Sequence, residues 1–279
     1  MRNVLVKGGR ILFFAVVPAR NEGRRIAKVI AKLVGAVADI VVPVVNGSTD
    51  STLNEIMAFS QDEIRPLMFT EALGPDVPRA VGAAYALREG ATGVLFVDGD
   101  MTQVPRKDLQ TLKAAVNTGG VDLALTNCYP PGAPPPEAPV AKRLVYFREE
   151  LNKCLGLPEL GSASPAHGPH AVSRRLLEII PIEELAKPPV ALARAARAGL
   201  KVTAAVNIPH RKLGSPSRGG YHSERIASTI IGDYLEALAV CRGFPRSRED
   251  SGVYYDGYDS SRRIDILLNY LSEKEPTGP

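Results

Sequence analysis

Short apolar runs alternate with helical stretches over the first 127 residues, and this alternation restricts the possible folds more than any other feature. The runs are brief and rich in Val, Ile, Leu and Phe, so they predict strands at 11–17, 40–45, 67–69, 94–97 and 121–126. Apolar residues at helical spacing predict helices between them, at 26–34, 53–57, 78–88 and from Pro105 onward. Strands that alternate with helices predict parallel βαβ units and a doubly wound α/β sheet.

Two prolines modify this prediction. Pro18 is expected to end the first strand. Pro43 lies inside the second strand, where proline cannot donate to the hydrogen-bond ladder, so we expect a bulge or a sheet edge there.

The chain changes character after residue 127. The segment 129–139 holds six prolines and predicts a linker or a lid over a site. Loops are expected at 156–169 and 209–221. Beyond residue 139 the pattern predicts one strand at 201–206 and helices at 140–155, 171–180, 190–198, 223–241 and 262–271. We therefore expect three parts, at 1–127, 128–222 and 223–279.

Composition excludes several classes of protein. The net charge is +4 and 23% of the residues are charged, which suits binding of small anions but is too weak a basic balance to indicate nucleic acid. No apolar run approaches the length of a membrane span. Cys128, Cys154 and Cys241 are odd in number and far apart, so they predict neither a disulfide framework nor a zinc site. A reducing cytoplasm is the expected location.

Two carboxylates end the fourth predicted strand. Asp98 and Asp100 flank Gly99, directly after the run 94–97. In an open α/β sheet, ligands bind at the carboxyl ends of strands. Carboxylate oxygens are hard ligands for Mg²⁺ or Mn²⁺, which take much of their remaining shell from phosphate and water. The pattern predicts a metal that carries a diphosphate, although an Asp-Gly turn without metal has the same letters.

Three motifs stand in a recognisable order, and together they resemble nucleotide-sugar glycosyltransferases of the GT-A fold, family 2 type. They are Val-Pro-Ala-Arg-Asn-Glu at 17–22, Asn-Gly-Ser-Thr-Asp-Ser-Thr at 46–52 and Asp-Gly-Asp-Met at 98–101. The resemblance implies a mostly parallel mixed sheet with flanking helices and a C-terminal helical extension. It also implies an NDP-sugar donor, bound by Pro18, Ala19, Arg20, Glu22, Asn46, Ser48, Arg79, Asp98, Gly99 and Asp100. Arg79 stands where such enzymes often have lysine.

The second half narrows this resemblance. Ser164 to Arg175, followed by Val206 to Arg211, is similar to the glucosyl-3-phosphoglycerate synthases and their mannosylglycerate-forming relatives. This implies a histidine that completes the metal shell with Asp98 and Asp100, namely His210, or His222 if the register differs. It also implies an acceptor site at His167, Gly168 and Arg174. Arg211 and Arg218 would hold the leaving diphosphate or a phosphorylated acceptor. Each histidine could equally be an ordinary surface residue.

These motifs lead to one expected reaction. A hexose would pass from a UDP- or GDP-sugar to a small anionic acceptor such as phosphoglycerate, with Mg²⁺ or Mn²⁺ bound and with Asp100 and Arg211 as catalytic residues. Inverting members of the family place an acid at the start of a helix in the second half, whereas 187–192 contains none, and Glu183 and Glu184 are the nearest. We therefore expect retention, with a donor phosphate oxygen taking the acceptor proton.

Other functions remain open at this stage. An inverting family 2 transferase could act on a lipid phosphate or a saccharide. A sugar-phosphate nucleotidyltransferase would also use metal carboxylates on an α/β sheet, but it needs a glycine-rich loop after the first strand. Asn46 stands where the resembled enzymes usually have an acid, and the acid expected in the second half is missing; both departures are compatible with a non-catalytic sugar-nucleotide binder. The tyrosine-bearing tail and the family analogy suggest a homodimer.

Overall fold

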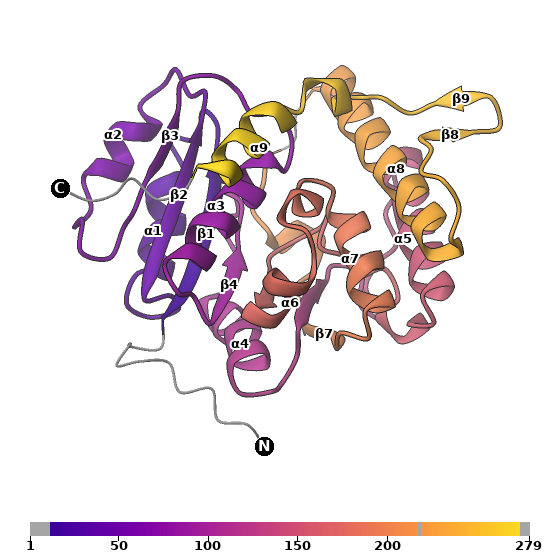
Figure 1. Cartoon of the computed structure of the whole chain (residues 1–279), viewed down its shortest axis with the longest axis horizontal. Helices are drawn as coiled ribbons and strands as arrows, with labels where there is room; N and C mark the ends of the chain where they lie inside the picture. The colour runs from indigo at the N-terminus through magenta and orange to yellow at the C-terminus, as the bar shows by residue number, and fades with distance from the viewer. Residues whose placement is uncertain (1–11, 217–218, 274–279) are drawn as a thin grey trace.

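A seven-stranded sheet runs through the centre of the molecule (Figure 1). The computed structural model describes residues 12–216 and 219–273. Six of the strands run parallel to one another, and β6 runs antiparallel to both of its neighbours. The strand order is β3 (Leu67–Phe69), β2 (Ile40–Asn46), β1 (Phe13–Ala19), β4 (Gly93–Phe96), β6 (His170–Ser173), β5 (Leu123–Asn127) and β7 (Val202–Asn207). This confirms the expected mostly parallel mixed sheet.

Helices cover both faces of this sheet. Because side chains alternate along a strand, β1 sends Phe13 and Ala15 into one core and Phe14 and Val16 into the other. The first core is closed by α1 (Ile26–Leu33), α2 (Thr52–Met57) and α4 (Arg106–Asn117). The second core is closed by α3 (Val77–Arg88), α5 (Pro139–Cys154), α6 (Arg174–Ile179), α7 (Pro188–Arg197), α8 (Gly220–Arg242) and α9 (Ile264–Ser272).

The helix α3 packs closely on the sheet. It is rich in Ala and buried on most sides, because it is packed between β1 and the helical layer outside it. A Cβ on Gly82 would lie 2.4 Å from Cγ1 of Val16, so only glycine permits this approach. The close packing fixes the start of α3, and with it Arg79, against the carboxyl end of β1.

The predicted helix at 171–180 is partly wrong. Residues 170–173 form the strand β6, which inserts between β4 and β5, and the helix α6 begins only at Arg174. The helical spacing of Leu176 and Leu177 with Ile180 extended the prediction backward over a strand of four residues. Such a strand is too short to show a period of its own.

The two prolines fit the ladder differently from expectation. The strand β1 continues through Pro18 to Ala19, because the carbonyl of Pro18 still accepts a hydrogen bond from the Gly99 amide at 3.0 Å. Pro43 causes no register shift, and β2 is an interior strand. Its missing donor faces β3, where the pairing lapses between an isolated bridge at Ile64 and the start of β3.

A disulfide joins Cys154 to Cys241, with the Cα atoms 6.5 Å apart, so the prediction of unpaired cysteines is wrong for these two. They are 87 residues apart in sequence and meet because α5 and α8 pack side by side (Figure 1). Cysteine spacing could not reveal this contact. Cys128 is free and buried, and burial raises the pKa of its thiol to about 12. No helix within 12–216 and 219–273 is both long and apolar enough to cross a bilayer.

Replacing Cys154 and Cys241 together by serine should lower the free energy of unfolding by about 2–4 kcal/mol, because the bond closes a long loop in the unfolded chain. Denaturant unfolding of the variant and the oxidised wild type measures this difference. Reductant should bring the wild type to the stability of the double variant and leave the variant unchanged. Equal stability of the oxidised wild type and the variant would contradict the prediction.

Candidate active site

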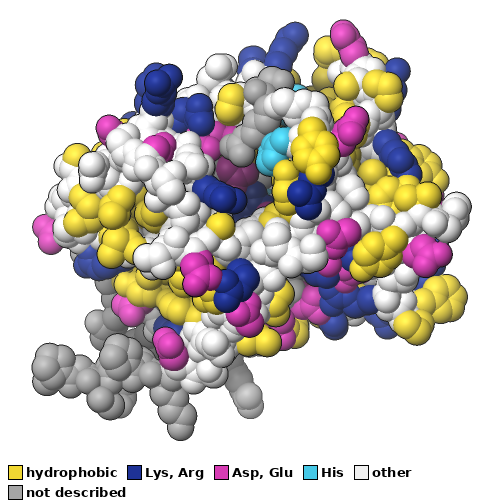
Figure 2. Space-filling model, turned by 90° about the horizontal axis from the view of Figure 1, so that it is seen from above, with side chains coloured by type: hydrophobic (Ala, Val, Ile, Leu, Met, Phe, Trp, Pro, Cys, Tyr) yellow, Lys and Arg dark blue, Asp and Glu magenta, His cyan; other side chains and the backbone are white. Residues whose placement is uncertain are grey.

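A cavity of about 290 Å³ opens where β1, β2 and β4 end. Figure 2 shows acidic and basic side chains gathered in a hollow on one face of the molecule, with histidine beside it. The structure brings nine of the predicted donor-binding residues together in the cavity wall: Pro18, Ala19, Arg20, Glu22, Asn46, Arg79, Asp98, Gly99 and Asp100. Ser48 does not line the cavity, and Arg218 lies outside the described residues.

Hydrogen bonds interlock the loops that follow β1 and β2. The Ser48 hydroxyl accepts a hydrogen bond from the backbone amide of Asn21 at 3.1 Å. The side-chain oxygen of Asn21 accepts one from the backbone amide of Thr49 at 2.8 Å. The Glu22 amide donates to Oγ1 of Thr52 at 2.7 Å. Ser48 therefore holds the first loop in place, and it acts on the cavity through Asn21.

The Asp98-Gly99-Asp100 segment is packed tightly at the end of β4. A Cβ on Gly99 would lie 3.0 Å from the Ile26 side chain and 3.1 Å from the Pro18 carbonyl. The glycine thus lets two carboxylates stand one residue apart at the cavity wall. Ser215 donates to Oδ1 of Asp100 at 2.8 Å. These carboxylate and hydroxyl oxygens are the ligand type that Mg²⁺ and Mn²⁺ prefer, so the donor set fits a divalent cation.

Arg79 is buried and joins Asp98 to a second carboxylate. Its Nη2 donates to Oδ1 of Asp98 at 2.6 Å, and its Nη1 donates to Asp76. Burial alone would lower the pKa of the guanidinium, but the charges of Asp98 and Asp76 outweigh burial and raise it. The side chain therefore presents a permanent cation at the end of the cavity where the paired aspartates lie.

The outer wall of the cavity comes from α8, which the sequence reasoning missed. Ile226, Thr229, Ile230 and Asp233 line the cavity opposite the loops of the first half. Asp233 is buried and receives two hydrogen bonds from Arg262, at 2.8 and 2.7 Å. The spacing of Ile226 and Ile230 predicted an apolar helix face. A single sequence carries no signal that this face covers a cavity formed by loops of the first half of the chain.

A second group of acids lies behind this wall. Asp233, Glu236 and Asp259 are close enough to share a cation. Basic side chains already occupy them, at 2.7 Å from Arg248 to Asp233, 2.6 Å from Lys187 to Glu236 and 2.5 Å from Arg262 to Asp259. This cluster is therefore an ion-pair network that ties α8 to the C-terminal segment.

The predicted histidines fall into two places. His167 and His210 contact each other, with 2.9 Å between Nε2 of His167 and Nδ1 of His210. Arg148 contacts Nδ1 of His167, also at 2.9 Å. Burial lowers the pKa of both imidazoles, and the charge of Arg148 lowers it further. His222 lies apart from this pair, with its Nδ1 3.0 Å from the Tyr258 hydroxyl.

The loop that follows His210 packs against the loop that carries Asp100. The Gln103 amide donates to the Leu213 carbonyl at 3.1 Å, and Ser215 reaches Asp100. Gly168 takes a positive φ of 82°, and a Cβ there would lie 3.0 Å from Sγ of Cys128. Glycine at 168 therefore allows the tight turn that places His167.

Arg211 and Arg174 are placed differently from each other. Arg211 is exposed and lines a second cavity of about 440 Å³, together with Tyr129, His210 and the proline-rich segment. Arg174 lies at the opposite edge of the sheet, where it contacts the Ala91 carbonyl and Glu178. The structure does not bring Arg174 together with the other predicted acceptor residues.

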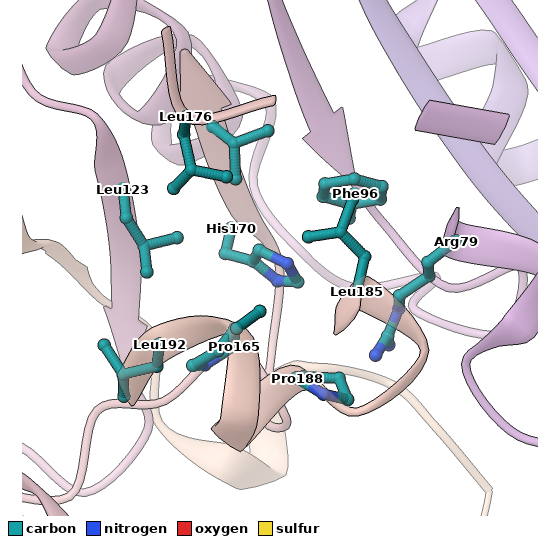
Figure 3. A pocket seen from close by; sticks show the side chains of 11 residues that line it. Arg79, Phe96, Leu123, Pro165, His170, Leu176, Leu185, Pro188 and Leu192 are labelled. Carbon is teal, nitrogen blue, oxygen red and sulfur yellow. The ribbon is translucent and has the colours of Figure 1, made fainter. Parts of the chain in front are cut away.

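A small apolar cavity lies behind Arg79 (Figure 3). The buried ring of His170 points into it and stacks on Phe96, with 4.9 Å between ring centroids. Burial and the charge of Arg79 lower the pKa of His170 to about 3. The cavity has a volume of about 10 Å³, which admits a single water. This space is part of the packing that supports Arg79 and is too small for a substrate.

Comparison with known proteins agrees with this architecture. Residues 14–171 match the family model described as glycosyl transferase family 2. Among curated proteins, none matches the chain in sequence. Solved structures of glucosyl-3-phosphoglycerate synthase from Mycobacterium tuberculosis are similar to it. The complex with Mn²⁺, UDP and phosphoglyceric acid has 25% identity and a TM-score of 0.61, covering 88% of this chain and 82% of that one.

Two other complexes of the same synthase give similar values. The complex with Mn²⁺, UDP-glucose and phosphoglyceric acid has 25% identity and a TM-score of 0.61, covering 88% of this chain and 83% of that one. The complex with phosphoglyceric acid alone has 25% identity and a TM-score of 0.62, covering 88% and 84%. The family model spans more than half of the chain, and the sheet, its flanking helices and the paired aspartates agree with it. The chain belongs to glycosyl transferase family 2.

Proposed function

We propose that this glycosyltransferase moves a hexose from a nucleoside diphosphate sugar to a small anionic acceptor, with Mg²⁺ or Mn²⁺ bound at Asp98 and Asp100. The observation that carries the proposal is the position of these two carboxylates. Both carboxylates line the cavity that the loops after β1 and β2 form. A cation at that edge of an α/β sheet is suited to bind a diphosphate.

The donor is inferred to be a UDP-sugar, with glucose as the first candidate. The similar synthase binds UDP and UDP-glucose with Mn²⁺. Arg20 and Arg79 line the same cavity wall and can donate to phosphate oxygens once a divalent cation offsets the charge of Asp98 and Asp100. Ile226 and Ile230 on α8 provide apolar surface opposite, of the kind that can pack against a base or a ribose.

The residues of the chain would divide the work among three tasks. When bound, the divalent cation supplies positive charge to the leaving nucleoside diphosphate. Asp98 and Asp100 hold that cation, and Arg79 keeps Asp98 oriented through the 2.6 Å hydrogen bond. Arg20, Glu22 and Asn46 border the space for the nucleoside, while α8 covers it and restricts access of water.

The carboxylates of the cavity favour a retaining reaction. Asp76, Asp98 and Asp233 are each ion-paired with buried arginine, and Glu22 is ion-paired with Arg25 at 2.5 Å. Glu184 is buried between Arg194 and Arg246, and Glu183 is exposed; neither lines the cavity. The cationic side chains bonded to these carboxylates compete with an acceptor hydroxyl for the carboxylate oxygens. We therefore assign the acceptor proton to a phosphate oxygen of the donor.

The acceptor is inferred to carry a phosphate or a carboxylate. The similar synthase binds phosphoglyceric acid. In this chain, Arg211 is exposed beside His210 in the neighbouring cavity and offers a cation to such a group. Phosphoglycerate is the first acceptor to test.

Replacing Asp100 by asparagine should abolish the stabilisation that Mn²⁺ adds to the UDP complex, because a neutral amide binds the cation poorly. Thermal shift with UDP, with and without Mn²⁺, measures this loss. Transfer from UDP-glucose should fall by about 100-fold or more. Asp62→Asn, at an exposed acid that does not line the cavity, is the matched control and should behave as wild type. Wild-type metal response in Asp100→Asn would contradict the proposal.

The anomeric configuration of the product gives a separate test of the proton assignment. With UDP-α-glucose as donor and phosphoglycerate as acceptor, proton NMR of the fresh product should show the α-linkage. Glu184→Gln should leave that linkage unchanged. A β-linked product would contradict retention while leaving the metal site intact.

A further inference from the structure

We propose that Arg148, acting through His167, holds His210 as a hydrogen-bond donor, so that His210 does not ligate the metal in this protein. The inference rests on the proposed function only in placing the metal at Asp98 and Asp100. It opposes the prediction from sequence resemblance that His210 completes the metal shell. The two positioning residues, Arg148 on α5 and His167 in the loop before β6, have no role in the proposed function.

Arg148 fixes the first step of a chain of hydrogen bonds. Its side chain is 4% exposed, and Nη1 lies 2.9 Å from Nδ1 of His167. A guanidinium carries donors and no acceptor, and it keeps its proton at every ordinary pH. Nδ1 of His167 must therefore accept, so it bears no hydrogen.

The protonation of His167 in turn determines which nitrogen of His210 accepts a hydrogen bond. With Nδ1 unprotonated, the ring is neutral and its proton is on Nε2. That nitrogen lies 2.9 Å from Nδ1 of His210, so His167 donates and His210 accepts. His210 is then also a neutral ring, with its own proton on Nε2. The outer nitrogen of His210 is an N–H donor that no hydrogen bond occupies within the described part of the chain.

Aromatic packing holds both rings in this arrangement. Tyr129 lies against them, with centroid distances of 5.7 Å to His167 and 6.1 Å to His210. Rotating the His210 ring by half a turn would place a carbon in the position of Nδ1 and break the bond to His167. The packing on Tyr129 thus restricts the planes of the two rings, and the contact between His167 and His210 sets which edge of the His210 ring faces His167.

Metal ligation through Nε2 of His210 conflicts with this chain. The proton of His210 would have to move to Nδ1, where it would face the N–H of His167 across 2.9 Å. Moving the proton of His167 to Nδ1 would then set it against the N–H of Arg148. His210 can ligate a cation only by leaving the pair. In the pair, its N–H suits an anionic oxygen instead.

The tautomers can be read directly in the wild-type protein. Selective ¹⁵N labelling of histidine and long-range ¹H–¹⁵N correlation should show both His167 and His210 protonated on Nε2, with His167→Gln and His210→Gln used for assignment. Adding Mg²⁺ and UDP should leave the protonated nitrogen of His210 unchanged. Protonation of His210 on Nδ1, either before or after Mg²⁺ is added, would overturn the inference.

Mn²⁺ affinity gives a second, independent readout, measured by electron paramagnetic resonance of free Mn²⁺ in the presence of UDP. In the wild-type background, His210→Ala should change the Kd for Mn²⁺ by less than twofold. Arg148→Met removes the permanent donor and should tighten Mn²⁺ binding, and adding His210→Ala to it should cancel the gain. Arg143→Met, on the same helix and bonded to Tyr255, is the matched control and should match wild type.

The outcomes separate this inference from the proposed function. A tenfold or greater weakening of Mn²⁺ binding by His210→Ala alone would overturn the inference and leave the aspartates as the metal site. Loss of the metal response in Asp100→Asn tests the proposed function in every background. If Arg148→Met does not fold, the wild-type tautomers and His210→Ala decide the matter between them.

Discussion

Charge balance at the end of β4 is the constraint on which the site depends. Asp98 is ion-paired with Arg79, Arg79 with Asp76, and Arg262 lies between Asp76 and Asp233. This alternation of charge begins at the proposed metal site and ends on α8. Each partner is mostly buried, so removing one charge would leave its neighbour uncompensated in a poorly solvated place, which is costly. The series therefore connects the cavity-lining residues Asp76 and Asp98 to the C-terminal helices.

This network also explains why α8 can serve as a cavity wall. A helix that covered the cavity only through Ile226 and Ile230 would bury little area. Arg248 and Arg262 both bind Asp233, and the disulfide at Cys241 ties the far end of the same helix to α5. The wall is thus fixed at two points along its length. The contact at Asp233 sets the position of the wall relative to the rest of the cavity, because Arg262 bonds to Asp233 and also lies 3.6 Å from Asp76.

The sequence predicted the first half of the fold because the relevant interactions there are local. Short apolar runs and helical spacing place β1, α1, β2 and α3 within a few residues, and nine predicted donor residues meet in one cavity. The second half depends on contacts across long separations. The strand β6 is fixed by pairing with β4 and β5, and the partner of Cys154 is fixed by the packing of α5 on α8. Neither contact leaves a periodic trace in the residues concerned.

The histidines show the same limit in chemical terms. A motif assigns a residue type to a position, but the role of an imidazole depends on which nitrogen carries the proton. For His210 that choice is made 62 residues earlier in the chain, by an arginine on α5 whose side chain looks like any other in an amphipathic helix. Since a guanidinium cannot accept a hydrogen bond, a single buried contact at 2.9 Å determines the polarity of two rings. Resemblance to a family can suggest which residues surround a cation, whereas the direction of their hydrogen bonds has to come from the packed structure.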